Sequence, residues 1–236
     1  ELRTGNDFNL NPFKNNDENQ LALQLNFRNL LIYNRGKQRY TTSYTYLNNK
    51  SRSELSFGFI ENNLKSHQFR FIHKFAVSWL VDFQSTIENT ESISENFLSK
   101  NFNIDDFSIN PKLSYLLNDN TRFDVFYQFS NQENTIGNKE TLLQQRYGTS
   151  FTFNKNEKAA ITGEFNYFSN DFTGNANAPV GYQMMQGLQP GKNFTWSLIA
   201  QKKLTKFLDL NLNYLGRKSE TSRVIHTGNI QLRAYF

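Results

Sequence analysis

The sequence of 236 residues combines 15% aromatic residues with no cysteine, so disulfide bonds and thiolate metal sites are excluded. Its net charge of +5 is scattered along the chain, which argues against a nucleic-acid-binding surface. No stretch approaches the roughly 20 apolar residues that a transmembrane helix needs, so a sequence this polar could span a membrane only as a β-barrel.

Residues 1–20 form a polar segment that is rich in asparagine and interrupted by Pro12. We expect this segment to be a linker, or to enter the interior of the folded domain as a plug. The folded domain is then expected to occupy residues 21–236.

From residue 21 onward, apolar and polar side chains alternate, as they do in strands whose two faces meet different surroundings. The pattern predicts twelve strands, at 21–27, 40–46, 55–59, 69–75, 79–83, 107–117, 123–129, 147–153, 159–167, 194–198, 208–214 and 224–236. A soluble sandwich also alternates, but it typically has seven to nine strands, and twelve apolar faces would need a very large interior. The sequence therefore predicts an all-β fold, an antiparallel transmembrane up-and-down β-barrel of about twelve strands. Part of a larger barrel is the alternative.

The predicted connections alternate in length. Tight turns are expected at 48–51, 74–78, 118–120, 154–157 and Lys206, and longer connections at 61–67, 88–105, 131–140, 169–193 and 215–223, with a short one at 34–36. Short periplasmic turns and long extracellular loops are the asymmetry expected of barrels in bacterial outer membranes. An even number of strands would return the N-terminus to the periplasmic side, together with the C-terminus.

The last strand is apolar on one face and stops on an aromatic residue. Its apolar face carries an expected insertion signature of Ile230, Leu232, Ala234 and Phe236. Such a segment resembles the closing strand of bacterial outer-membrane barrels. The resemblance implies recognition by the barrel-assembly machinery, and closure of the barrel against the strand that begins at Leu21.

Charges of both signs are expected on the inward face. Their arrangement predicts braces across a narrow lumen, since facing opposite charges stabilise a sheet and a selective pore more often shows one sign. The expected braces are Arg39, Glu54, Arg70, Asp82, Lys112, Asp124, Asp209 and Arg233. A path for ions or solutes is the alternative.

The connection 169–193 is unusually apolar for a loop, and loops this long are often functional. We expect it to fold inward as a plug or to pack on a partner protein. The residues concerned are Phe172, Val180, Tyr182, Met184, Met185 and Leu188.

The candidate catalytic groups do not form a recognisable set. Outer-membrane phospholipases use Ser, His and Asn, and His226 has Ser222 and Thr227 near it, but nothing in the spacing indicates a nucleophile with its base. The acidic stretch from Glu88 to Asp106 lacks the spacing of a calcium loop. We therefore expect no enzyme activity, no metal site and no cofactor.

The C-terminal third looks like the C-terminal barrel of large outer-membrane proteins of Bacteroidota, the flavobacterial kind in particular. The resemblance rests on the segments 187–196, 203–214, 216–220 and 226–228. It implies a Gram-negative outer membrane, with the C-terminus in the periplasm, long loops outside, and contacts with the lipid bilayer and lipopolysaccharide. It also implies that the chain is part of a longer protein with outer-membrane proteins or lipoproteins as partners, and it supplies no catalytic residues.

Three functions follow from these observations. The first is a barrel that anchors or scaffolds a larger outer-membrane protein or complex. The second is a transporter or secretion component whose lumen passes a solute or a polypeptide, and the third and weakest is a lipid hydrolase.

Overall fold

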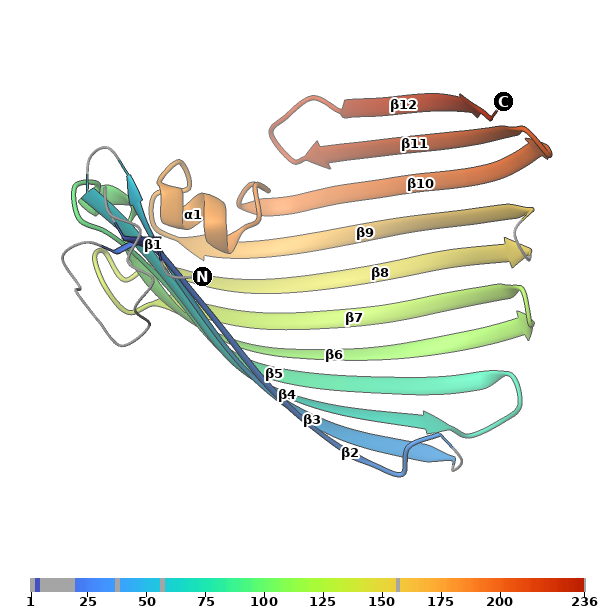
Figure 1. The fold of residues 1–236 in the computed structure, drawn as a ribbon, viewed down its shortest axis with the longest axis horizontal. Helices are drawn as coiled ribbons and strands as arrows, with labels where there is room; N and C mark the ends of the chain where they lie inside the picture. Colours follow the sequence, from blue (N-terminus) through green and yellow to red (C-terminus); the bar gives the residue numbers. More distant parts are fainter. Residues whose placement is uncertain (1–2, 5–19, 37–38, 56–57, 156–157, 236) are drawn as a thin grey trace.

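The structure, a computed structural model, describes residues 3–4, 20–36, 39–55, 58–155 and 158–235 and consists of one antiparallel sheet. The strands follow one another in chain order without a crossover (Figure 1). Their bounds are β1 (Arg3–Thr4), β2 (Gln20–Tyr33), β3 (Tyr40–Leu55), β4 (Gly58–Lys74), β5 (Trp79–Ser94), β6 (Phe102–Asn118), β7 (Thr121–Asn134), β8 (Thr141–Lys155), β9 (Ala159–Thr173), β10 (Gly191–Thr205), β11 (Leu208–Ser219) and β12 (Ile225–Ala234).

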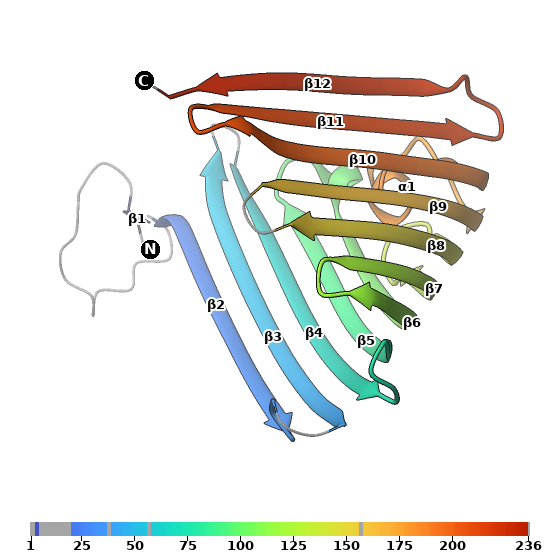
Figure 2. The same cartoon turned by 90° about the vertical axis from the view of Figure 1, so that its right-hand side faces the viewer.

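The sheet curls strongly, so that β2–β5 swing away from β10–β12 and a concave side forms between them (Figure 2). The only α-helix among the described residues, α1 (Pro179–Met184), lies in the connection between β9 and β10. A short 3-10 helix follows β5 at Leu98–Lys100. Neither helix has the length and apolar character that crossing a bilayer requires.

The predicted closure of the barrel is not seen. Within the described residues β12 pairs with β11 alone, and β2 pairs with β3 and, at two positions, with β1. The sheet is therefore open, with free edges along β2 and β12. Phe236 and most of the segment 1–20 lie outside the described residues.

The prediction of twelve full strands is also not confirmed, because the sheet has eleven long strands and the two-residue β1. The predicted turn 48–51 and loop 61–67 lie inside β3 and β4, where Asn48 faces Lys65 and Ser51 faces Asn62. The alternation fades there because both faces carry polar side chains, while the backbone ladder continues. The two predicted strands at 55–59 and 69–75 are replaced by β4 alone.

The connections define two ends of the sheet. The tight connections 75–78, 119–120 and 206–207 lie at one end, called here the turn end, and the connections 95–101, 135–140 and 174–190 lie at the other, the loop end. With eleven long strands, β2 begins at the loop end and β12 finishes at the turn end, at opposite ends of the sheet (Figure 1). The long strands therefore do not show the predicted even count, and the connection after Tyr33 lies at the turn end, while the N-terminus lies outside the described residues.

The buried apolar core is small and lies at the loop end on the concave side. The core contains Val180 and Met184 of α1 and Met185, the residue after it. These side chains pack with Ile104 from β6 and Leu142 from β8. Leu142 on β8 and Asp106 on β6 both stand opposite Gln132 on β7 in the register. Ile104 lies two residues before Asp106, so all four side chains are on the concave face. The helix is therefore folded into the concavity.

Replacing Leu142 by Ala should release α1 from the wall. Leu142 is 0% exposed, so its truncation should cost about 2–5 kcal/mol of stability and open the connection 174–190 to protease. The neighbouring Leu143 lies on the opposite face and is half-exposed, so Leu143→Ala is the matched control. Equal cleavage of both variants in limited proteolysis would contradict the assignment.

Candidate functional site: the two faces of the sheet

The convex face carries a band of apolar side chains that crosses every long strand. On β7 the band runs from Phe123 to Phe129, and on β9 from Ala159 to Tyr167. At about 3.3 Å per residue, these seven to nine residues extend about 23–30 Å along the strand. Large apolar residues of the band are solvent-exposed in the isolated chain, Val125 to 61%.

The border of the band toward the loop end is marked by aromatic or histidine side chains. They are Tyr46, His67, Phe107, Phe129, Tyr147, Tyr167, Phe194, Tyr214 and His226. Two positions beyond the border, on the same face, most strands carry a polar or charged residue: Asn48, Lys65, Asp105, Asn131, Gln145, Ser169 and Lys192. The change from apolar to polar is therefore abrupt on these strands, and its position shifts along the register from strand to strand, since Phe107 faces Asn131 and Phe129 faces Gln145.

Many of these border rings touch one another across strands. The Tyr167 ring lies 6.2 Å from that of Tyr147 and 5.2 Å from that of Phe194, centre to centre. A second series borders the turn end, where the rings of Trp79 and Tyr115 are 4.8 Å apart. Both borders of the apolar band thus carry aromatic rings.

Two histidines belong to the first border and bond to tyrosine. His67 Nδ1 lies 2.7 Å from the Tyr44 hydroxyl, and His226 Nδ1 lies 2.8 Å from that of Tyr214. The same Tyr214 hydroxyl accepts a hydrogen bond from the indole of Trp196. These bonds hold the imidazoles on aromatic neighbours, and no serine or threonine hydroxyl contacts His226 in the described interactions. No group of three metal-ligating side chains occurs among the described residues.

The concave face is polar, and three of the predicted charges meet on it. Asp82 on β5 accepts a hydrogen bond of 2.8 Å from Arg70 Nε and lies 3.5 Å from Lys112 Nζ. Its side chain is nearly buried between them. Arg70 and Lys112 come from β4 and β6, so this carboxylate connects three adjacent strands.

Asp124 lies on the same face but does not pair with the Lys112 of the neighbouring strand. Lys112 faces Phe126, whereas Asp124 faces Ser114 and accepts bonds from Arg122 at 2.7 Å and from Ser150 at 3.1 Å. Asp124 therefore pairs within its own strand and with hydroxyls on its two neighbours.

The remaining predicted charges are spread over other places. Glu54 lies on the convex face with its register partner Phe59, at the loop end, which corrects its assignment to the interior. The reason is that β3 extends unbroken to Leu55, which places even-numbered residues outside. Arg39 precedes β3, and its carbonyl accepts a bond from the Lys74 amide. Asp209 and Arg233 are register partners on β11 and β12.

A cluster around Arg146 was not found from the sequence. The Arg146 guanidinium donates to Glu164 at 2.7 Å and to Asn166 at 3.0 Å, and stacks on the rings of Phe126 and Phe168. A Cβ on the neighbouring Gly148 would collide with the Phe126 ring, so glycine leaves room for that ring. The residues lie 18–22 positions apart in the sequence, and only the strand register brings them together.

The residues of the predicted plug or partner loop mostly face inward. Val180, Met184 and Met185 are buried in the core, and Phe172 and Leu188 pack against it. Tyr182 is the exception, with 67% of its surface exposed. The helix covers only part of the concave face, on the side of β6 and β8.

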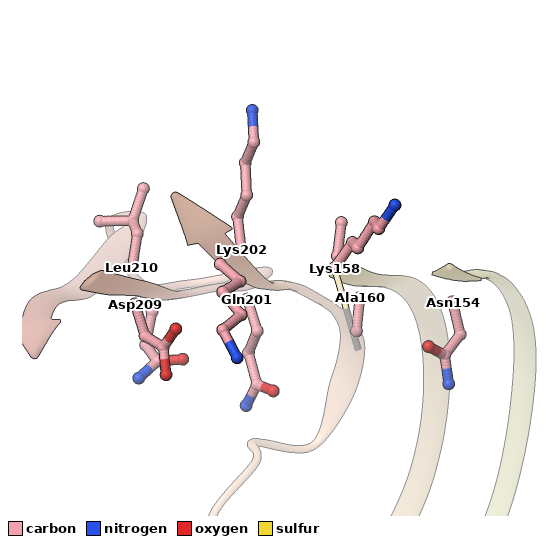
Figure 3. A pocket seen from close by; sticks show the side chains of 10 residues that line it. Asn154, Lys158, Ala160, Gln201, Lys202, Asp209 and Leu210 are labelled. Atoms are coloured by element: carbon pink, nitrogen blue, oxygen red, sulfur yellow. The ribbon is translucent and has the colours of Figure 1, made fainter. Parts of the chain in front are cut away.

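Open space lined by both polar and apolar side chains remains elsewhere on this face. A pocket of about 520 Å³ lies beside the Arg146 cluster and is also lined by Gln186, Thr195 and Arg217. A second, of about 460 Å³, lies at the turn end, where Asn154, Gln201 and Asp209 point to the same side of the sheet (Figure 3). The described residues therefore line the concavity with polar groups without filling it.

Comparison with solved structures finds similarity to outer-membrane proteins. The outer-membrane channel DcaP of Acinetobacter baumannii aligns with a TM-score of 0.54 and 10% identity over 88% of this chain and 61% of that one. The β-domain of the Bordetella autotransporter Brka (TM-score 0.47, 6% identity, 91% and 90% covered) and the NanC porin (0.45, 11%, 89% and 99%) align less well. No protein-family model and no curated protein matches.

The first alignment shows the fold. The chain has the antiparallel strand arrangement of an outer-membrane β-barrel wall and spans about 61% of the length of the channel it matches. Sequence identity of 10% supports no transfer of function.

Replacing Asp82 by Asn should leave Arg70 and Lys112 without their shared counter-charge. The variant should lose about 2 kcal/mol in the free energy of unfolding, measured by urea titration of the purified protein in detergent or vesicles. Lys50 and Glu61 form a more exposed pair on the convex face, and Glu61→Gln should change stability by less than about 0.5 kcal/mol. Similar losses in both variants would show that Asp82 is not a special brace.

Proposed function

We propose that this chain forms part of the wall of a β-barrel in the outer membrane of a Gram-negative bacterium. The observation that carries the proposal is the convex apolar band with aromatic rings along both borders. Outer-membrane barrels present such a band, about 25 Å tall, to lipid between two aromatic girdles. In water the same band would be a large exposed apolar surface, which monomeric soluble proteins rarely tolerate.

The turn end is proposed to face the periplasm and the loop end the exterior. This orientation follows the rule that barrels have short periplasmic turns and longer outer loops. The C-terminal strand then ends in the periplasm. The polar convex residues beyond the loop-end border would meet lipopolysaccharide headgroups, and insertion would use the barrel-assembly machinery.

Within the barrel, the concave face is proposed to line a passage for polar solutes, narrowed by α1. The open pockets beside Arg146 and at the turn end support a passage, because neither is filled by described side chains. The inward fold of the connection 174–190 removes the apolar surface that a protein partner would need. We also propose that the protein is not an enzyme, because His67 and His226 are bonded to tyrosine hydroxyls.

A role as membrane anchor or scaffold of a larger protein is the second candidate. The strand-to-strand contacts of Asp82 favour it, because a braced and capped wall suits a barrel that conducts nothing. The resemblance to C-terminal barrels of Bacteroidota proteins, with outer-membrane proteins or lipoproteins as partners, points the same way.

A charge in the middle of the apolar band should destabilise the protein in a bilayer. Val125→Arg places a cation near the proposed midplane and should cost about 2–4 kcal/mol, measured by chemical unfolding from vesicles. Asn131→Arg, on the same face of the same strand beyond the border, should cost about 0–1 kcal/mol. Equal costs would contradict the proposed membrane position of the band.

Conductance separates a passage from an anchor. We expect the full protein in planar bilayers to show stable channels, and deletion of 176–186 to raise the single-channel conductance because it removes α1. Tyr182→Ala, which alters only an exposed side chain of the helix, is the control and should leave conductance unchanged. Absence of channels in both the full protein and the deletion variant would favour the anchor role.

A further inference from the structure

The pocket beside the Arg146 cluster combines charged, hydroxyl-bearing and apolar side chains on adjacent strands. Its volume of about 520 Å³ is within the range of sites that hold small organic molecules. The register places four of its lining residues, Asn166, Thr195, Arg217 and Ile225, in one row across β9 to β12. Paired strands therefore form the floor of the pocket and fix the spacing of these side chains.

The two arginines of this pocket differ in their partners. Arg146 donates to the Glu164 carboxylate at 2.7 Å, and Asn166 donates to the same oxygen at 2.8 Å. Glu164 is the one carboxylate among the described residues that line the pocket, and Arg146 balances its charge. Arg217 has no ion-pair or hydrogen-bond partner in the described part of the chain. The pocket therefore carries one uncompensated positive charge.

The side chains around Arg217 are apolar or carry hydroxyl groups. Ile225 faces Arg217 on β12, and Leu215 lies two residues before it on the same face. Both stay exposed on the concave face, Leu215 to 46% and Ile225 to 44%. Ser197 and Thr227 line the pocket and stand opposite Leu215 on either side. Their hydroxyls can bond the hydroxyls of a ligand, while the apolar side chains contact its C–H surface.

We propose that this pocket binds a small organic anion that carries hydroxyl groups, a sugar acid for example, with its carboxylate on the Arg217 guanidinium. The planar guanidinium matches a carboxylate with two parallel hydrogen bonds. A cation would be repelled by Arg217, and a neutral sugar would leave its charge unused.

The inference rests on the proposed passage and names the class of solute that it takes. Arg217 lies three residues beyond Tyr214 toward the loop end, and Tyr214 belongs to the loop-end border of the apolar band. In the proposed orientation the site is therefore near the outer mouth of the passage. A solute that arrives from outside would meet Arg217 before the deeper part of the lumen.

Binding is tested with glucuronate and with glucose, a neutral molecule of nearly the same size, by NMR titration of the purified full protein in detergent. We expect glucuronate to bind about tenfold more tightly than glucose at low salt. The difference should shrink in about 1 M salt, because salt screens the charge.

Arg217→Gln should weaken the binding of glucuronate about tenfold and leave that of glucose unchanged. Arg217→Lys, which keeps the charge, should retain part of the affinity. Lys218→Gln is the matched control, because Lys218 is the next residue and faces Phe194 on the convex side. It should bind glucuronate as the unchanged protein does.

The inference would be overturned by a lack of glucuronate binding, by equal affinity for glucose, or by unchanged affinity in Arg217→Gln. In planar bilayers, glucuronate should also reduce the current through open channels, and less so in Arg217→Gln than in Lys218→Gln. Binding in detergent without any channels in bilayers would count against the proposed passage and support the site.

Discussion

The backbone ladder between consecutive antiparallel strands is the interaction on which the rest of the structure depends. It connects the strands in order from β2 to β12, and among the described residues Phe168 is the only buried hydrophobic side chain outside the small core around Leu142. A soluble protein could not rely on this ladder alone, because its apolar band would stay in contact with water. In a bilayer, lipid covers the band and the ladder satisfies the polar backbone, so a sheet with little core is sufficient.

The sequence allowed accurate prediction where one face of a strand stays apolar along its length. Strands β7 to β9 and their tight connections could be placed from alternation alone. Prediction failed in β3 and β4, where the convex face becomes polar beyond Tyr46 and His67 while pairing continues. That failure produced an extra strand and moved Glu54 to the wrong face. The Arg146 cluster could not be predicted, because its members meet only through the strand register, and the alternation of side chains does not reveal the register.

The inward position of α1 explains why the connection between β9 and β10 is so apolar. Its methionines do not need a protein partner, since Leu142 and Ile104 supply an apolar floor within an otherwise polar face. That floor fixes the helix against the wall near β6 and β8, beside the Arg146 pocket, which is lined by residues of strands β8 to β12 and by Gln186 just after the helix. A concavity that is covered by the helix on one side and left open on the other fits the proposed passage better than a sealed lumen.

The odd number of long strands determines how the two edges of the sheet are related. Ten antiparallel pairings separate β2 from β12, so these two strands run in the same direction. Direct pairing of β2 with β12 would therefore be parallel, in a sheet whose other pairs are all antiparallel. Because a bilayer leaves no water to satisfy the backbone groups of an open edge, the described strands alone do not make the closed antiparallel sheet that a membrane requires.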